Sequence, residues 1–117
     1  MKIQEMVSLL KADVLTCKEK LDSEVHSACG SDMMSDVLAF VKDQAVLLTG
    51  LVNAQVIRTA DMMDMRCVVF VRNKKPTEEM LSLAEESGIV VLASPLRMYE
   101  ACGTLYAEGL CSSRCAQ

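Results

Sequence analysis

The sequence predicts a single α/β domain with a mostly parallel sheet flanked by helices. Three apolar runs, AVLLTG from Ala45, CVVFV from Cys67 and IVVLA from Ile89, have the near-continuous hydrophobicity of strands covered on both faces. Helical signals follow each run, and strands that alternate with helices favour right-handed crossovers and parallel pairing. The length of 117 residues fits one domain.

The first thirty residues pattern less clearly than the rest. A helix is predicted over residues 3–10, because its apolar side chains fall on one face: Ile3, Met6, Val7 and Leu10. Short strands are expected at residues 13–16 and 24–29, on either side of the charged turn Lys18-Glu19-Lys20. Gly30 ends the second strand, and Ser31 or Asp32 is expected to cap a helix. The apolar face of that helix would carry Met33, Met34, Val37, Leu38 and Val41.

The later helices have clearer boundaries. Asn53 is expected to cap a helix whose inward side chains are Val56, Ile57, Ala60 and Met63. Another helix is expected between Pro76-Thr77 and Gly88, with Glu78 and Glu79 in its first turn. Pro95 is expected to open a last helix that runs to about Glu108 and ends at Gly109.

Composition and charge exclude several classes of partner. The net charge of −4 and the lack of a basic stripe argue against a nucleic-acid partner. No apolar run approaches the ~20 residues of a membrane span, and residues 1–5 do not resemble a signal peptide, so we expect a cytoplasmic protein.

Four of the six cysteines lie in patterned segments and are expected to pack as reduced thiols: Cys17, Cys29, Cys67 and Cys102.

Three loops that follow predicted strands carry the candidate ligand-binding residues. In open α/β sheets, ligands bind beyond the carboxyl ends of the strands, near a switch in strand order. The hydroxyl of Thr49 and the N–H groups of the helix near Asn53 would hold an anion, and Asp32 would meet a hydroxyl or amine. The alternative is that Gly50 only turns the chain, because the sequence contains neither a P-loop nor a dinucleotide-binding motif. The candidate residues are Ser31, Asp32, Thr49, Gly50, Asn53 and Arg72.

No catalytic constellation or resident cofactor is expected. His26 with Cys29 could form a nucleophile pair, and Asp32 with Asp36 could hold a cation, but single surface residues of these kinds are far commoner. Residues 111–117 are expected to form a flexible tail beyond the domain of residues 1–110. Its pair Cys111 and Cys115 is a weak candidate for metal binding or a disulfide, since zinc normally takes four ligands.

The chain as a whole resembles the DRTGG-domain family. The resemblance covers nearly everything before the tail and is carried by four blocks: IQEMVSLLKADVLT, CGSDMMSDVLAFV, LLTGLVNAQVIRTADMMDMRCVVFVRNKKPTEEMLSLAEESGIVVLASP and RMYEACGTLYAEGL. The pentapeptide that names the family is absent, and residues 49–53, TGLVN, stand about where its glycine turn belongs.

The resemblance implies a regulatory role without catalysis. The family is similar to the N-terminal domain of HPr kinase/phosphorylase, and its members resemble regulatory or dimerising modules attached to phosphotransacetylases, to CBS-containing pyrophosphatases or to a kinase domain. Stand-alone versions are associated with the iron-hydrogenase and redox systems of anaerobes. The resemblance therefore favours an accessory module that forms a homodimer, with a protein partner in a redox or regulatory system. The alternative is a sensor that binds a nucleotide or other phosphorylated anion.

Overall fold

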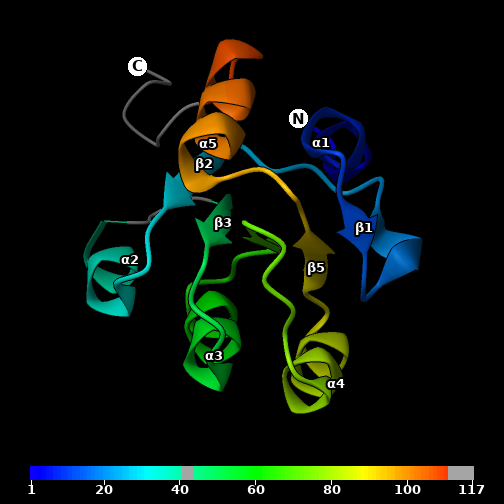
Figure 1. The fold of residues 1–117 in the computed structure, drawn as a ribbon. Helices are drawn as coiled ribbons and strands as arrows, with labels where there is room; N and C mark the ends of the chain where they lie inside the picture. Colours follow the sequence, from blue (N-terminus) through cyan, green and yellow to red (C-terminus); the bar gives the residue numbers. More distant parts are fainter. Residues whose placement is uncertain (41–43, 111–117) are drawn as a thin grey trace.

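The computed structural model describes residues 1–40 and 44–110 as three layers, with helices on both faces of a central sheet (Figure 1). Its strands are β1 (Asp13–Val14), β2 (Ser27–Gly30), β3 (Ala45–Thr49), β4 (Cys67–Phe70) and β5 (Val90–Ala93). Its helices are α1 (Ile3–Leu10), the 3₁₀ turn η1 (Lys18–Lys20), α2 (Met34–Phe40), α3 (Ala54–Met62), α4 (Glu78–Ser87) and α5 (Met98–Ala107). No helix among these residues is both long and apolar enough to cross a membrane.

The sheet confirms the predicted fold class. Its strand order is β1-β5-β4-β3-β2, with β2 to β5 parallel and β1 antiparallel to β5. Because the parallel strands follow one another in chain order, right-handed crossovers place α2, α3 and α4 on one face. The chain changes face after β5, so that α5 joins α1 on the other face (Figure 1). The reversal of strand order at which ligands were expected to bind does not occur within the described parallel strands.

Each face of the sheet has its own core. Along β3, Val46 and Leu48 pack with α1 and α5, whereas Ala45 and Leu47 pack with α2, α3 and α4. All five residues of β3 are buried, which explains why its sequence is apolar from Ala45 to Leu48 rather than alternating. Since burying a Val or Leu side chain contributes roughly 1.5–3 kcal/mol, this strand is a principal source of stability for both layers.

The N-terminal strands are shorter than predicted because other groups replace the expected pairing. Beyond β1, the Thr16 hydroxyl donates to the Ile89 carbonyl at 2.7 Å and accepts from the Val91 N–H at 2.8 Å. Before β2, Val25 donates its N–H to the carbonyl of Met1, so this segment pairs with the N-terminus instead of with β3. Side-chain and terminal hydrogen bonds of this kind cannot be recognised from strand periodicity.

The helices agree with prediction at their caps more than in their inward faces. Side chains of Asn53 and Thr77 accept backbone N–H groups at the starts of α3 and α4, as predicted. Gly88 ends α4 in the left-handed conformation. Met33, just before α2, and Leu38, within it, were expected to face inward but are 60% and 43% exposed. This helix covers the edge of the sheet and has a helical neighbour, α3, on one side, so only the stripe with Met34 and Val37 is buried. Val41, expected on the same face, lies outside the described residues.

Candidate functional site

Four loops meet at the carboxyl edge of the parallel strands. The Ser31 N–H donates to the carbonyl of Leu48, and the Val71 N–H donates to the carbonyl of Thr49, both at 3.0 Å. Ser94, after β5, donates its N–H to the carbonyl of Phe70. The three predicted loops are therefore neighbours, and the loop after β5 joins them as a fourth.

The loop after β3 is organised around the Asp32 carboxylate. The Thr49 hydroxyl donates to Asp32 Oδ1 at 2.9 Å, and the Gly50 N–H donates to the same oxygen at 2.7 Å. Thr49 is fully buried, and its hydroxyl also accepts the N–H of Leu51. The Thr49 hydroxyl, which was expected to hold an external anion, thus binds a carboxylate of the chain itself, together with the Gly50 N–H. This arrangement makes Thr49 a positioning group for Asp32.

Arg72 reaches the same glycine from the loop after β4. A Cβ atom at Gly50 would overlap the Arg72 guanidinium, so the glycine permits this close approach, and its φ is not in the left-handed region. Arg72 and its neighbour Asn73 have φ angles of 59° and 56°, in the left-handed region. That conformation costs roughly 1–2 kcal/mol per residue and is held by backbone hydrogen bonds to the loop after β5. These bonds run from the Arg72 N–H to the Leu96 carbonyl at 2.7 Å and from the Asn73 N–H to the Ser94 carbonyl at 3.0 Å.

Ser31 and Asn53 serve the helices that follow them. The Ser31 hydroxyl accepts the Met33 N–H at 3.0 Å and donates to the Met33 carbonyl, which forms a turn just before α2. The Asn53 side chain accepts the Gln55 N–H at 2.8 Å and caps α3. Of the six candidate residues, the structure therefore gathers Asp32, Thr49 and Arg72 around Gly50, with the turn at Ser31 and the helix cap at Asn53 beside them.

Ser94 belongs to this edge, and the sequence analysis missed it. It is fully buried, donates its hydroxyl to the carbonyl of Leu10 at 2.7 Å and accepts the N–H of Leu96 at 3.1 Å. It therefore links the end of α1 to the loop that holds Arg72. The Ser-Pro pair directly after IVVLA was the available signal, because a turn there places a polar side chain at the strand end.

The other candidates do not assemble into a catalytic centre among the described residues. Burial raises the pKa of the Cys29 thiol, and the charges of Cys102 and Asp36 raise it further, whereas an activated nucleophile needs a lowered pKa. Asp32, the possible partner of Asp36 in a cation site, uses its carboxylate on the loop after β3. Cys111, Cys115 and the tail of residues 111–117 lie outside the described residues.

Comparison with known proteins gives a family and a structural relative. The sequence profile of the DRTGG domain matches residues 5–106. A solved structure of the CBS and DRTGG domains of the regulatory region of Clostridium perfringens pyrophosphatase, in complex with its activator diadenosine tetraphosphate, has a similar fold with a TM-score of 0.72 and 14% identity. The match covers 89% of this chain and 45% of the solved chain, so this chain spans less than half of that structure. No curated protein sequence matches the chain.

Proposed function

This chain belongs to the DRTGG domain family, and from this membership we propose that it is a non-catalytic regulatory domain that senses a small phosphorylated ligand, such as a nucleotide. Two findings support the proposal. The solved relative is a regulatory region in complex with an activating nucleotide. In this chain, an exposed guanidinium and an exposed carboxylate contact the same glycine at the carboxyl edge of the sheet.

The placement of the Arg72 guanidinium and the Asp32 carboxylate against the same residue, Gly50, is the observation on which the proposal rests. Arg72 would bind a phosphate group, because its planar guanidinium forms charge-assisted hydrogen bonds to phosphate oxygens. The N-terminus of α3, directly after this loop, adds the positive end of a helix dipole. Asp32, fixed by Thr49 and by the Gly50 N–H, would accept a hydroxyl or amine of the same ligand. A nucleotide offers both kinds of group.

A thermal-shift panel of nucleotides and phosphorylated metabolites, including diadenosine tetraphosphate, tests this function. A ligand at 100 times its Kd should stabilise the protein by about 2.7 kcal/mol. Arg72→Ala should abolish that shift, whereas Lys74→Ala, an exposed cation in the same loop, should keep it. The double variant Thr49→Val with Asn53→Ala should weaken it by disturbing Asp32 and the start of α3. If no compound stabilises the wild type, or if Arg72→Ala responds equally, the site is wrong.

Self-association is a second candidate function, favoured by the outer face of α5. Tyr99 and Tyr106 are 87% and 65% exposed, and a shallow apolar groove of about 640 Å³ lies along the helix between them. Tyrosine is enriched in protein interfaces relative to the rest of the surface. We expect a homodimer in gel filtration with light scattering, and Tyr99→Ser with Tyr106→Ser to dissociate it. A monodisperse wild-type monomer at high micromolar concentration would contradict this proposal.

A protein partner in a redox system is the remaining part of the proposed function. It rests on the resemblance to stand-alone members of the family that accompany iron-hydrogenase systems. Titration of the purified chain against a purified iron hydrogenase tests it, and a lack of saturable binding at micromolar concentrations would count against this partner.

A further inference from the structure

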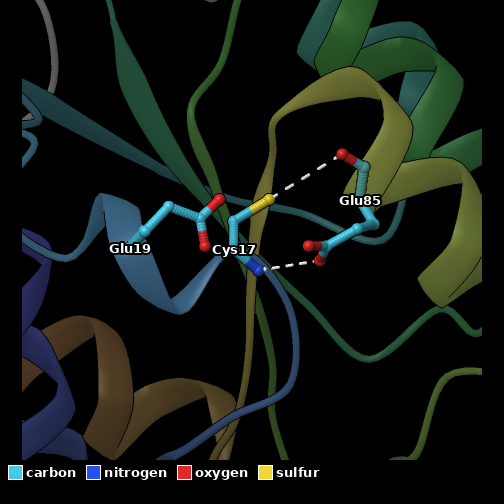
Figure 2. A group of neighbouring side chains, drawn as sticks. All are labelled: Cys17, Glu19 and Glu85. Carbon is cyan, nitrogen blue, oxygen red and sulfur yellow. Dashed lines mark hydrogen bonds between the residues drawn. The ribbon is translucent and has the colours of Figure 1, made fainter.

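A second cluster of chemically reactive side chains lies at the opposite edge of the sheet from Gly50. Cys17 precedes η1, Glu19 lies within it, and Glu85 comes from the last turn of α4 (Figure 2). One potential ligand atom from each side chain lies within 4.8 Å of the others. Figure 2 shows the two glutamates on two sides of the cysteine. Segments that are 68 residues apart in sequence thus bring one sulfur and two carboxylates together.

The sulfur atom in this cluster is buried and has no short hydrogen bond. The Cys17 side chain is 3% exposed, and the Glu85 carbonyl, its polar contact, is 4.0 Å from Sγ, at the outer limit for a sulfur hydrogen bond. A carboxylate oxygen of Glu19 and one of Glu85 each lie within 4.8 Å of this sulfur. A buried sulfur therefore points into a negatively charged environment that a bound cation would neutralise.

The backbone fixes one of the carboxylates next to this sulfur. The Cys17 N–H donates to Glu85 Oε2 at 2.9 Å, which holds the carboxylate in place and leaves its other oxygen to bind a ligand. Cys17 has a φ of 51°, a left-handed conformation that directs its N–H and its side chain toward the end of α4. The ligand atoms of Cys17 and Glu85 are thus arranged before any cation binds, and the exposed side chain of Glu19 completes the set.

We propose that Cys17, Glu19 and Glu85 bind a divalent cation of borderline softness, with zinc as the best match. Magnesium and calcium take oxygen ligands and do not favour a thiolate, whereas zinc accepts both sulfur and carboxylate oxygen. On binding, the thiol proton passes to solvent and an S–Zn bond forms, so one proton is released for each zinc ion bound. Three protein ligands leave the fourth tetrahedral position to water. The bound ion would fasten η1 to the end of α4 and would act as an effector separate from the ligand at Gly50.

Anaerobic titration with Co²⁺, followed by competition with zinc, tests the site, because zinc binds such ligands more tightly than cobalt does. The full chain should carry Cys111→Ser and Cys115→Ser, which removes the tail thiols as alternative ligands. We expect a thiolate-to-metal charge-transfer band that saturates at one ion per chain and disappears on addition of zinc. Magnesium and calcium should not displace the bound ion.

Matched variants separate this site from other thiols. Cys17→Ser should abolish the charge-transfer band, and Cys102→Ser, which removes a half-buried thiol on α5, should retain it. Glu19→Gln changes an exposed side chain and should weaken the affinity by at least about tenfold, so the test does not depend on the folding of Cys17→Ser. The proposal is overturned if the tail-substituted chain shows no band, if the band survives Cys17→Ser, or if Glu19→Gln binds as tightly as its parent.

Discussion

The loop after β3 and the turn before η1 both use a carboxylate to accept a backbone N–H, yet they differ in the charge that surrounds it. At Gly50 the chain places the Arg72 guanidinium against the same residue that Asp32 contacts. At Cys17 a second carboxylate and a buried thiol stand beside Glu85, and Lys20 offsets them only in part. The same backbone device therefore lies among charges of both signs at one edge and beside a second carboxylate and a buried thiol at the other.

The largest difference between the two edges should appear when each carboxylate is removed. Asp32→Ala should reduce the free energy of unfolding by about 2 kcal/mol, because it leaves the buried Thr49 hydroxyl and the Gly50 N–H without their acceptor. Glu85→Ala removes the acceptor of one backbone N–H and should cost about 1 kcal/mol. Urea unfolding measures both values. Asp36→Ala is the control at an exposed acid, and equal losses for Asp32→Ala and Asp36→Ala would refute the role given to Asp32.

The thiol of Cys67 differs from that of Cys17, because burial alone raises the pKa of Cys67 whereas carboxylates also raise the pKa of Cys17. The thiol has a higher pKa in the folded chain than its unfolded value of about 8.5. Its contribution to stability is therefore fully present below pH 8.5, and it is lost as the pH rises above that value, because the unfolded chain then loses the thiol proton while the folded chain keeps it. The free energy of unfolding should therefore fall by up to about 1.4 kcal/mol per pH unit from this group. Cys67→Ala should flatten the slope measured by urea unfolding between pH 8 and 10. An unchanged slope would contradict the account.

Two glycines provide the smallest test, because they occupy the two edges for different reasons. Gly88 has a φ of 74°, so Gly88→Ala should cost about 1 kcal/mol through backbone strain. Gly50 makes room for the tip of a flexible arginine, and Gly50→Ala should cost less than about 0.5 kcal/mol because Arg72 can swing away. The same variant should nevertheless lose the nucleotide-induced thermal shift. A stability loss at Gly50 as large as that at Gly88 would show that its backbone, not the arginine, requires glycine.

Local signals predicted most elements of the fold. The apolar run of β3, the cap at Asn53 and the start and end of α4 at Thr77 and Gly88 all depend on neighbours within a few residues, and all were confirmed. The inward face predicted for α2 and the residue before it was wrong at Met33 and Leu38, because burial there depends on how far the helix extends past the edge of the sheet. Helical periodicity shows which side chains share a face of a helix, but it does not show how much of that face the rest of the protein covers.

The candidate site likewise divides into features that the local sequence predicted and contacts that depend on the packing of the sheet. The sequence identified the loops at the strand ends, and it identified Arg72 and Asp32 as charged residues within them. The pairing of Asp32 with Thr49 and Gly50 depends on the parallel register of β2 and β3, in which Gly30 lies beside Leu48. The contact between Cys17 and Glu85 likewise depends on β1 pairing with β5.

By itself, the sequence determined the fold class, the helix caps and the apolar strands, because hydrophobic periodicity and capping act between residues close in the chain. Only the tertiary structure decided which charges meet. Strand order and register bring together residues that are 17 positions apart at Asp32 and Thr49, and 68 apart at Cys17 and Glu85. Such contacts arise from the packing of the whole sheet, and no local pattern specifies them.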